Sequence, residues 1–324
     1  MKIGFTTSFP IEPFIAAGHE VIDLNNVFIN GKSKELVQAA EYMGYPRNIC
    51  AWIKGMYALI RESDYDYILG VIQGDCSNTH SLLSTLEDEG QKILHFSFPF
   101  DRNKDALERE ISRLEDFCGV SRVETLQVKK EMDRVRKKLV KLDTLTWQNG
   151  KVTGKENHVW QVSASDFNGD YKLLEKELDK FLIEVEDRTP KNDGLRLGYL
   201  GVPPIITDLY EFLENRKVNV VYNEIQRQFA MPYLEKDIVD QYWRYTYPYN
   251  IFIRLEDIKE QIKLRNLDGV ISYTQSFCHR QIDNILIKKY AGIPVLTLEG
   301  DNPGALDERT RLRLESFIDM LNFR

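Results

Sequence analysis

Short apolar runs alternate with stretches of helical periodicity along the first hundred residues. The runs are four to five residues long, which is typical of strands in a parallel sheet, and they occupy residues 3–6, 20–24, 68–72 and 93–96. The helical stretches cover residues 10–17, 34–42, 52–62 and 81–89, and three of them end close to a glycine. This alternation predicts a mainly parallel sheet with helices packed on its faces.

The pattern changes between residues 101 and 189. Long helical periods that are dense in charge cover residues 104–117, 123–145 and 171–185, and a shorter piece at 158–163 is strand-like. We interpret the charge runs as solvated helix faces. This region is therefore expected to form a helical layer or linker arm.

A turn cluster at residues 188–194 precedes a second α/β unit. Its expected strands are 195–200, 219–222, 270–273 and 294–298. The first expected helix ends near residue 214, and the others cover 255–264, 281–289 and 307–321. The sequence thus predicts an α/β protein with two Rossmann-like, doubly wound domains, divided into an N-terminal domain at 1–100, a helical region at 101–190 and a C-terminal domain at 191–324. The two domains share no sequence period, so only a structural repeat is predicted.

Composition narrows the class of protein. The chain has 324 residues, of which 43% are hydrophobic and 29% charged, as in soluble globular proteins. A formal net charge of −7 disfavours nucleic acid as a principal partner. No apolar run reaches the roughly 18 residues of a membrane span, and the first residues resemble a strand and not a signal peptide. We expect a cytoplasmic protein whose four cysteines are thiols or metal ligands and not disulfides.

Two cysteines follow strands in the same way. Cys76 comes after the apolar run 68–72 and a polar break, at the mouth of a helix for which Ser77 or Asn78 is the expected cap. Cys278 repeats this design after the run 270–273. Ligands of open α/β sheets bind at such strand ends, and a helix N-terminus favours the thiolate. We therefore expect these two cysteines to face one site.

The other cysteines and the known motifs are less informative. Cys50 follows a turn and precedes a helix, whereas Cys118 sits at a helix end and is interpreted as a small buried hydrophobe. The spacing of Cys50, Cys76 and Cys278 matches no zinc-finger or ferredoxin pattern, so a joint metal site and three unrelated core cysteines both remain open. Phosphate-loop, dinucleotide and nucleophile-elbow motifs are absent. The aromatic segment 241–249 fits a pocket, an interface or the core.

Five stretches together resemble the 2-hydroxyacyl-CoA dehydratase family, which includes the 2-hydroxyglutaryl-CoA dehydratase D-component and the benzoyl-CoA reductase B and C subunits. The stretches are Thr7–Gly18, Asp23–Asn26, Gly44–Gly55, Gln73–Thr79 and Gln275–Cys278. The similarity spans nearly the whole chain. The combination is specific, although no single stretch is.

The resemblance implies an iron–sulfur enzyme. It implies that Cys50, Cys76 and Cys278 hold one 4Fe–4S cluster with an open fourth iron. It also implies pairing with a related subunit, as a homodimer or heterodimer, and a separate ATP-dependent iron–sulfur activator that supplies one low-potential electron. In the dehydratases this electron turns an acyl-CoA thioester into a ketyl radical, which expels the neighbouring hydroxyl. ATP chemistry then belongs to the partner, which agrees with the missing phosphate loop.

Two further residues are candidates for catalysis. Ser8 follows the first expected strand and could approach the open iron, and Glu12 on the next helical turn could serve as an acid or base. Each has a structural alternative: Ser8 as a helix cap beside Pro10, and Glu12 as a favourable charge in the first turn of a helix.

The chain is shorter than the usual subunits of the family and resembles its compact, single-gene branch, for which a CoA substrate is a weaker inference. A reductase or electron-transfer protein with the same cluster, fed by an ATP-driven reductase, is the second reading. The third is a binding or scaffold protein with buried, metal-free cysteines.

Overall fold

Two four-stranded sheets organise the computed structural model, which describes residues 1–191 and 193–323. Every strand pairs in parallel, in the orders β2-β1-β3-β4 and β6-β5-β7-β8. The first sheet contains β1 (Lys2–Phe5), β2 (Glu20–Asp23), β3 (Tyr67–Gln73) and β4 (Ile93–Ser97), and the second contains β5 (Leu195–Leu200), β6 (Val218–Asn223), β7 (Gly269–Gln275) and β8 (Val295–Gly300). The predicted α/β class and the structural repeat are confirmed, because the two orders are the same.

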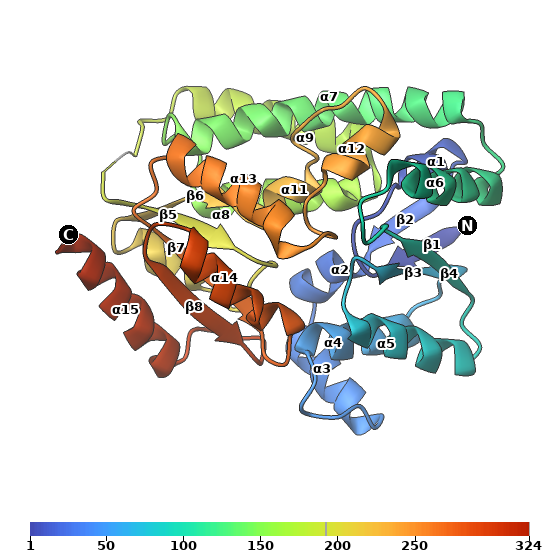
Figure 1. Ribbon diagram of the computed structural model, residues 1–324, viewed down its shortest axis with the longest axis horizontal. Coiled ribbons are helices and arrows are strands. Elements are labelled where there is room, and N and C mark those ends of the chain that lie inside the picture. Colours follow the sequence, from blue (N-terminus) through green and yellow to red (C-terminus); the bar gives the residue numbers. More distant parts are fainter. Residues whose placement is uncertain (192, 324) are drawn as a thin grey trace.

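Helices cover the sheets in three groups (Figure 1). Those of the first half are α1 (Glu12–Ala16), α2 (Leu24–Asn30), α3 (Ser33–Tyr42), α4 (Ala51–Arg61) and α5 (Ser77–Asp88). The middle group is α6 (Lys104–Cys118), α7 (Arg122–Trp147), α8 (Gly154–Val162), the 3₁₀ turns η1 (Ser163–Ser165) and η2 (Phe167–Gly169), and α9 (Tyr171–Glu186). Those of the second half are α10 (Leu209–Glu214), α11 (Glu224–Phe229), α12 (Ile238–Arg244), α13 (Ile251–Leu264), η3 (His279–Gln281), α14 (Asp283–Tyr290) and α15 (Glu308–Asn322).

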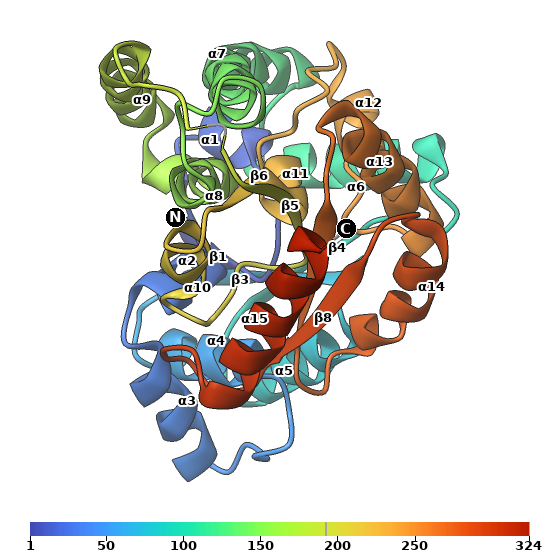
Figure 2. The same cartoon turned by 90° about the vertical axis from the view of Figure 1, so that its left-hand side faces the viewer.

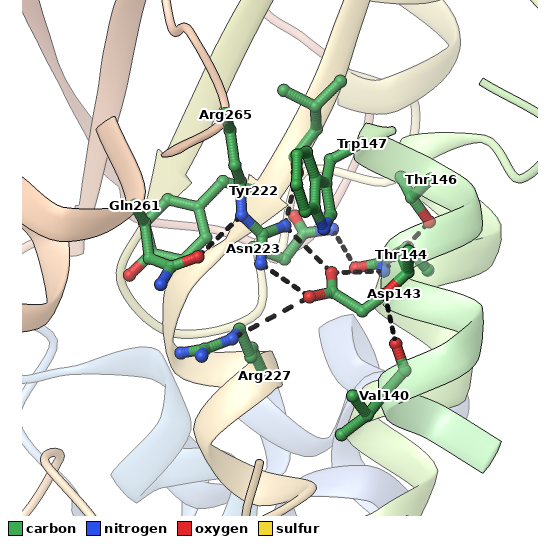
Figure 3. Close-up of polar contacts among 12 residues, drawn as sticks. Val140, Asp143, Thr144, Thr146, Trp147, Tyr222, Asn223, Arg227, Gln261 and Arg265 are labelled. Carbon is green, nitrogen blue, oxygen red and sulfur yellow. Dashed lines mark hydrogen bonds and ion pairs between the residues drawn. The ribbon is translucent and has the colours of Figure 1, made fainter. Parts of the chain in front are cut away.

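The long helix α7 runs along both halves of the molecule (Figures 1 and 2). Its first turn is fixed by a capping box between Ser121 and Glu124. Further along, Arg136 donates to Glu12 of α1 at 2.9 Å. One helical turn before its end, Asp143 accepts two hydrogen bonds from Arg265, at 2.9 and 2.5 Å (Figure 3). One rigid helix therefore holds each half through a buried arginine–carboxylate pair.

A segment of the second half packs into the core of the first. Tyr242, Tyr245 and Tyr249 are buried in the same apolar cluster as Phe98, which follows β4. The ring centroids of Phe98 and Tyr245 lie 5.9 Å apart, and those of Phe98 and Tyr249 lie 6.0 Å apart. This segment bridges the two halves, and the division at residues 100 and 190 stays a prediction.

Two local expectations differ from the structure. The strand-like piece at 158–163 is mostly the helix α8, because Thr153 and Glu156 form a capping box that starts a helix there. Helix α2 was not expected and begins where Asp23 accepts a hydrogen bond from the backbone N–H of Asn25 at 2.9 Å. No helix in the described ranges is long and apolar enough to cross a membrane.

Candidate metal centre

Cys50, Cys76 and Cys278 line one cavity of about 100 Å³ between the two halves. Each is the residue immediately before a helical segment: Cys50 before α4, Cys76 before α5 and Cys278 before η3. None of the three makes a side-chain hydrogen bond that caps its helix. The expectation that Ser77 or Asn78 caps α5 is therefore wrong, because Cys76 occupies the cap position itself.

The loop before Cys76 depends on a glycine. Gly74 has a φ of +101°, a conformation that a side chain rarely tolerates. A Cβ atom at this position would lie 2.7 Å from the Cβ atom of Pro248 in the other half. Glycine thus allows the end of β3 to turn sharply and lets the two halves approach each other beside the cavity.

The loop before Cys278 turns in a different way. Phe277 has a φ of +64°, which is uncommon for a residue with a side chain and marks local strain. The backbone N–H of Cys278 donates to the carbonyl of Gln275 at 3.1 Å. This tight turn aims the cysteine at the cavity directly after β7.

Burial makes the three thiols hard to ionise when no cation is present. It raises the pKa of Cys50 to about 12, and charge on Cys278 and Cys76 would raise this pKa further. Burial raises the pKa of Cys76 to about 11, with the charge of Asp75 adding to the rise, and it also raises the pKa of Cys278. Backbone N–H groups of the following helical turn oppose each rise. Such thiols release their protons when a metal binds.

The geometry differs from that of a single-ion site. Among residues 1–191 and 193–323, no three His, Cys, Asp or Glu side chains are close enough together to hold one metal ion. Thiolates on one ion all lie about 2.3 Å from it, whereas thiolates on separate irons of a cube lie further apart. The three thiols share a cavity without forming such a single-ion cluster in the described residues.

Polar groups without partners face the same cavity. Ser8 lines it, and its Oγ atom has no hydrogen-bond partner although the residue is only 3% exposed. Gln275 also lines it, and its Oε1 atom has no partner. Buried polar atoms without partners are uncommon, and both of these belong to residues that line the cavity. The cavity therefore offers spare hydrogen-bonding groups beside its thiols.

The opposite wall supplies a positive charge. Arg280 lines the cavity, donates to the carbonyl of Tyr247 at 2.8 Å and lies 3.6 Å from Asp283. Its guanidinium also stacks over the Tyr247 ring at 4.6 Å from the centroid. The arginine is thus held in place beside Cys278 and can offset negative charge on a bound group.

Glu12 and Cys118 lie elsewhere. The Glu12 carboxylate is fully buried and accepts hydrogen bonds from Arg136 at 2.9 Å, Tyr242 at 2.9 Å and Gln241 at 3.3 Å. It is not among the cavity-lining residues. Cys118 ends α6, is partly buried and packs against the core of the first half. The structure brings together Ser8 and three cysteines, and it brings neither of these two residues to them.

Several residues of the cavity wall were not expected from the sequence to be site residues. They are Asp23, Asn25, Asn26, Thr79 and Tyr247. A signal existed for Asp23, which ends a strand, and for Tyr247, which belongs to the aromatic segment. Their convergence depends on contacts between distant segments, which periodicity does not report.

Comparison with known proteins identifies the family of this chain. A direct comparison of the sequence with curated proteins finds no match. The family described as 2-hydroxyglutaryl-CoA dehydratase, D-component, matches residues 6–321, which is nearly the whole chain. The matched range contains both sheets and all three cavity cysteines. The protein therefore belongs to the 2-hydroxyglutaryl-CoA dehydratase D-component family.

Proposed function

We propose that this dehydratase-like component holds a 4Fe–4S cluster on Cys50, Cys76 and Cys278 and acts as a 2-hydroxyacyl-CoA dehydratase-like lyase. The observation that carries the proposal is the meeting of three capping-position cysteines, from both halves of the chain, in one cavity. The fit is supported by the unpaired Ser8 and Gln275 oxygens and by first-turn N–H groups that favour thiolates.

When bound, the cluster would supply one-electron reduction of a thioester carbonyl, with an open iron as the place where that oxygen docks. The chain's own groups would do the rest. Three thiolates hold the cluster, Ser8 offers a hydroxyl beside it, and Arg280 offsets negative charge that develops there. Burial of most residues around the cavity would limit the access of water to the reacting atoms.

The remaining parts of the proposal concern partners and setting. A separate ATP-dependent iron–sulfur activator would deliver the electron, because this chain carries no phosphate-binding loop. The protein would pair with a second copy of itself or with a related subunit. It would act in the reducing cytoplasm. Acid–base catalysis by Glu12 stays a prediction that the geometry does not favour, since its carboxylate already accepts three hydrogen bonds.

A second function is favoured by the size of the cavity. The cavity that the three cysteines line has a volume of about 100 Å³. This small volume favours a small molecule over a long thioester chain as the occupant beside a cluster. A low-potential reductase or electron-transfer protein, fed by an ATP-dependent activator and inactive on CoA thioesters, is therefore the alternative.

The test begins with reconstitution of the purified chain with iron and sulfide under strictly oxygen-free conditions. We expect about four irons per chain, the number in a 4Fe–4S cluster, and a paramagnetic signal after one-electron reduction. Turnover of 2-hydroxyacyl-CoA to enoyl-CoA, with the activator and ATP, supports the lyase. A cluster that takes up electrons but converts only small oxidants supports the reductase. A colourless, iron-free chain after this treatment contradicts both.

A further inference from the structure

Two buried carboxyl groups lie together beside the cavity. Asp23 ends β2 and lines the cavity, and Asp166 lies between η1 and η2. They are 3% and 7% exposed. The backbone N–H of Asp23 donates to Oδ2 of Asp166 at 2.9 Å, which fixes the second carboxyl beside the first.

The partners of both groups are neutral. Asp23 Oδ1 accepts from the backbone N–H and from the side-chain amide of Asn25, at 2.9 and 2.7 Å. Asp166 Oδ1 accepts from the backbone N–H of Asn168 at 3.0 Å and from the side chain of Asn26 at 3.5 Å. Amide donors satisfy the oxygens but carry no compensating charge.

Other buried acids of this protein are paired with arginines. Glu12 is paired with Arg136, Asp143 with Arg265, and Glu224 with Arg254. Each pair neutralises a buried carboxylate with a guanidinium. The carboxyls of Asp23 and Asp166 have no such partner among the ion pairs of residues 1–191 and 193–323.

The charged groups around the pair are all engaged elsewhere. Arg136, which faces the Phe167 ring next to Asp166, is paired with Glu12 and Asp133. Lys54 on α4 is paired with Glu41. Across the cavity, Arg280 lies beside Asp283 and Tyr247, and Asp75 accepts from Thr79. The Tyr245 hydroxyl is buried and has no hydrogen-bond partner.

Two uncompensated carboxyls in one buried place cannot both ionise easily. Burial raises the pKa of Asp23. Burial, and then the charge of Asp23, raise the pKa of Asp166 to about 7. Ionisation of Asp23 therefore opposes ionisation of Asp166, and the two carboxyls titrate as a coupled unit.

We propose that Asp23 is the proton-transfer group of this site and that Asp166 is the positioning residue that keeps a proton available to it. The proposal rests on the lyase function proposed above. Asp23 qualifies because it alone of the two lines the cavity that Ser8 and the three cysteines also line.

One shared proton is sufficient for a dehydration. Loss of water from a 2-hydroxyacyl thioester breaks the C2–O bond and one C3–H bond and forms a C2–C3 double bond. The proton of the pair would go to the departing hydroxyl oxygen and produce water. The proton released from C3 would return to the pair. The electron that the activator supplies is regained at the end of each cycle, so no net oxidant or reductant is consumed.

The first test measures the pair itself, in the chain without iron. Infrared difference spectra across a pH titration report the carbonyl stretch of protonated carboxyl groups. We expect a buried carboxyl that loses its proton near pH 7, and we expect Asp166→Asn to abolish that transition. Asp75→Asn is the control, because burial also raises the pKa of Asp75, to about 6, and this variant must leave the transition near pH 7 in place. A transition that survives Asp166→Asn overturns the proposal.

The second test measures turnover in the cluster-loaded enzyme. Asp23→Asn keeps a good N-cap for α2 but cannot carry the proton. We expect its kcat to fall about 10²- to 10⁴-fold, with iron content unchanged and KM within a few-fold. Asp23→Glu should recover part of the loss, and Asp166→Asn should shift the pH profile of kcat. A wild-type chain that dehydrates no 2-hydroxyacyl thioester contradicts the lyase function, whereas an active wild type with an unimpaired Asp23→Asn variant contradicts this proposal alone.

Discussion

The two halves of the protein share one strand order but differ in the residues that their loops carry. In each half a cysteine follows the third strand, Cys76 after β3 and Cys278 after β7. The helix before that third strand is α4 in the first half and α13 in the second. Cys50 stands at the cap position of α4, whereas Asn250 stands at that of α13 and caps it, accepting from the N–H of Phe252 at 3.0 Å. Equivalent positions thus carry a cysteine that lines the cavity in one half and a helix-capping asparagine in the other.

The loops after the first strand of each half differ in a related way. Thr6, Thr7 and Ser8 follow β1, and the apolar pair Val202 and Pro203 comes shortly after β5. All five residues line the cavity. The shared topology brings both loops to the same place, because parallel strands end at one edge of their sheet. The choice of residues then makes the loop after β1 polar and the loop after β5 apolar.

The largest effect is expected at the cysteine that the second half contributes. Cys278→Ala removes one of three thiolates, so we expect iron content after anaerobic reconstitution to fall to near zero. Cys118→Ala is the matched control: Cys118 is also a partly buried cysteine with a raised pKa, but it lies outside the cavity and should leave iron unchanged. Equal iron loss in the two variants would show that the ligands are misassigned.

The next largest effect concerns the helix that spans both halves. Arg265→Met removes the guanidinium that hydrogen-bonds Asp143 and leaves only that of Arg227, 3.8 Å away, whereas Arg136→Met leaves Glu12 without its guanidinium. Removing one partner of a buried pair costs about 3–5 kcal/mol, so each variant should unfold at clearly lower urea concentrations. Loss of the Asp143–Arg265 pair, drawn in Figure 3, should loosen the second half, and loss of the Glu12–Arg136 pair the first.

Lys141→Met provides the control for that comparison on the same helix. Lys141 pairs with Glu186 at 3.3 Å, and both side chains are more than half exposed. An exposed pair contributes about 0–1 kcal/mol, so this variant should unfold almost like the wild type. If all three variants unfold alike, α7 does not hold the halves through its buried pairs.

Much of the fold was predictable because its signals are local. Strand 195–200 and the long charged helices follow directly from apolar runs and periodicity. The cysteine loops after β3 and β7 were predictable for the same reason, since a strand followed by a polar break places the next residue at the sheet edge.

The rest of the site depends on distant contacts. Nothing local joins Asp23 to Asp166, which are 143 residues apart and meet only through the packing of η2 on β2. Glu12 is a residue whose candidate role in catalysis came from the sequence but whose partner did not. Its position in a first helical turn suggested an exposed or reactive acid, but the sequence did not reveal that Arg136, 124 residues later, neutralises it. Both cases depend on charge pairing across the fold, which no window of sequence contains.

The smallest effect on stability is expected at the cap positions that distinguish the halves. Asn250→Ala removes the side-chain acceptor at the start of α13 and should cost about 1 kcal/mol in urea unfolding, with iron content unchanged. Cys50→Asn places the residue of the second half into the first. Because Cys50 makes no capping hydrogen bond, the iron-free variant should be at least as stable as the iron-free wild type, but it should bind little iron. If Cys50→Asn instead destabilises the iron-free chain and Asn250→Ala does not, the two positions are not equivalent caps, and the repeat extends only to the strand order.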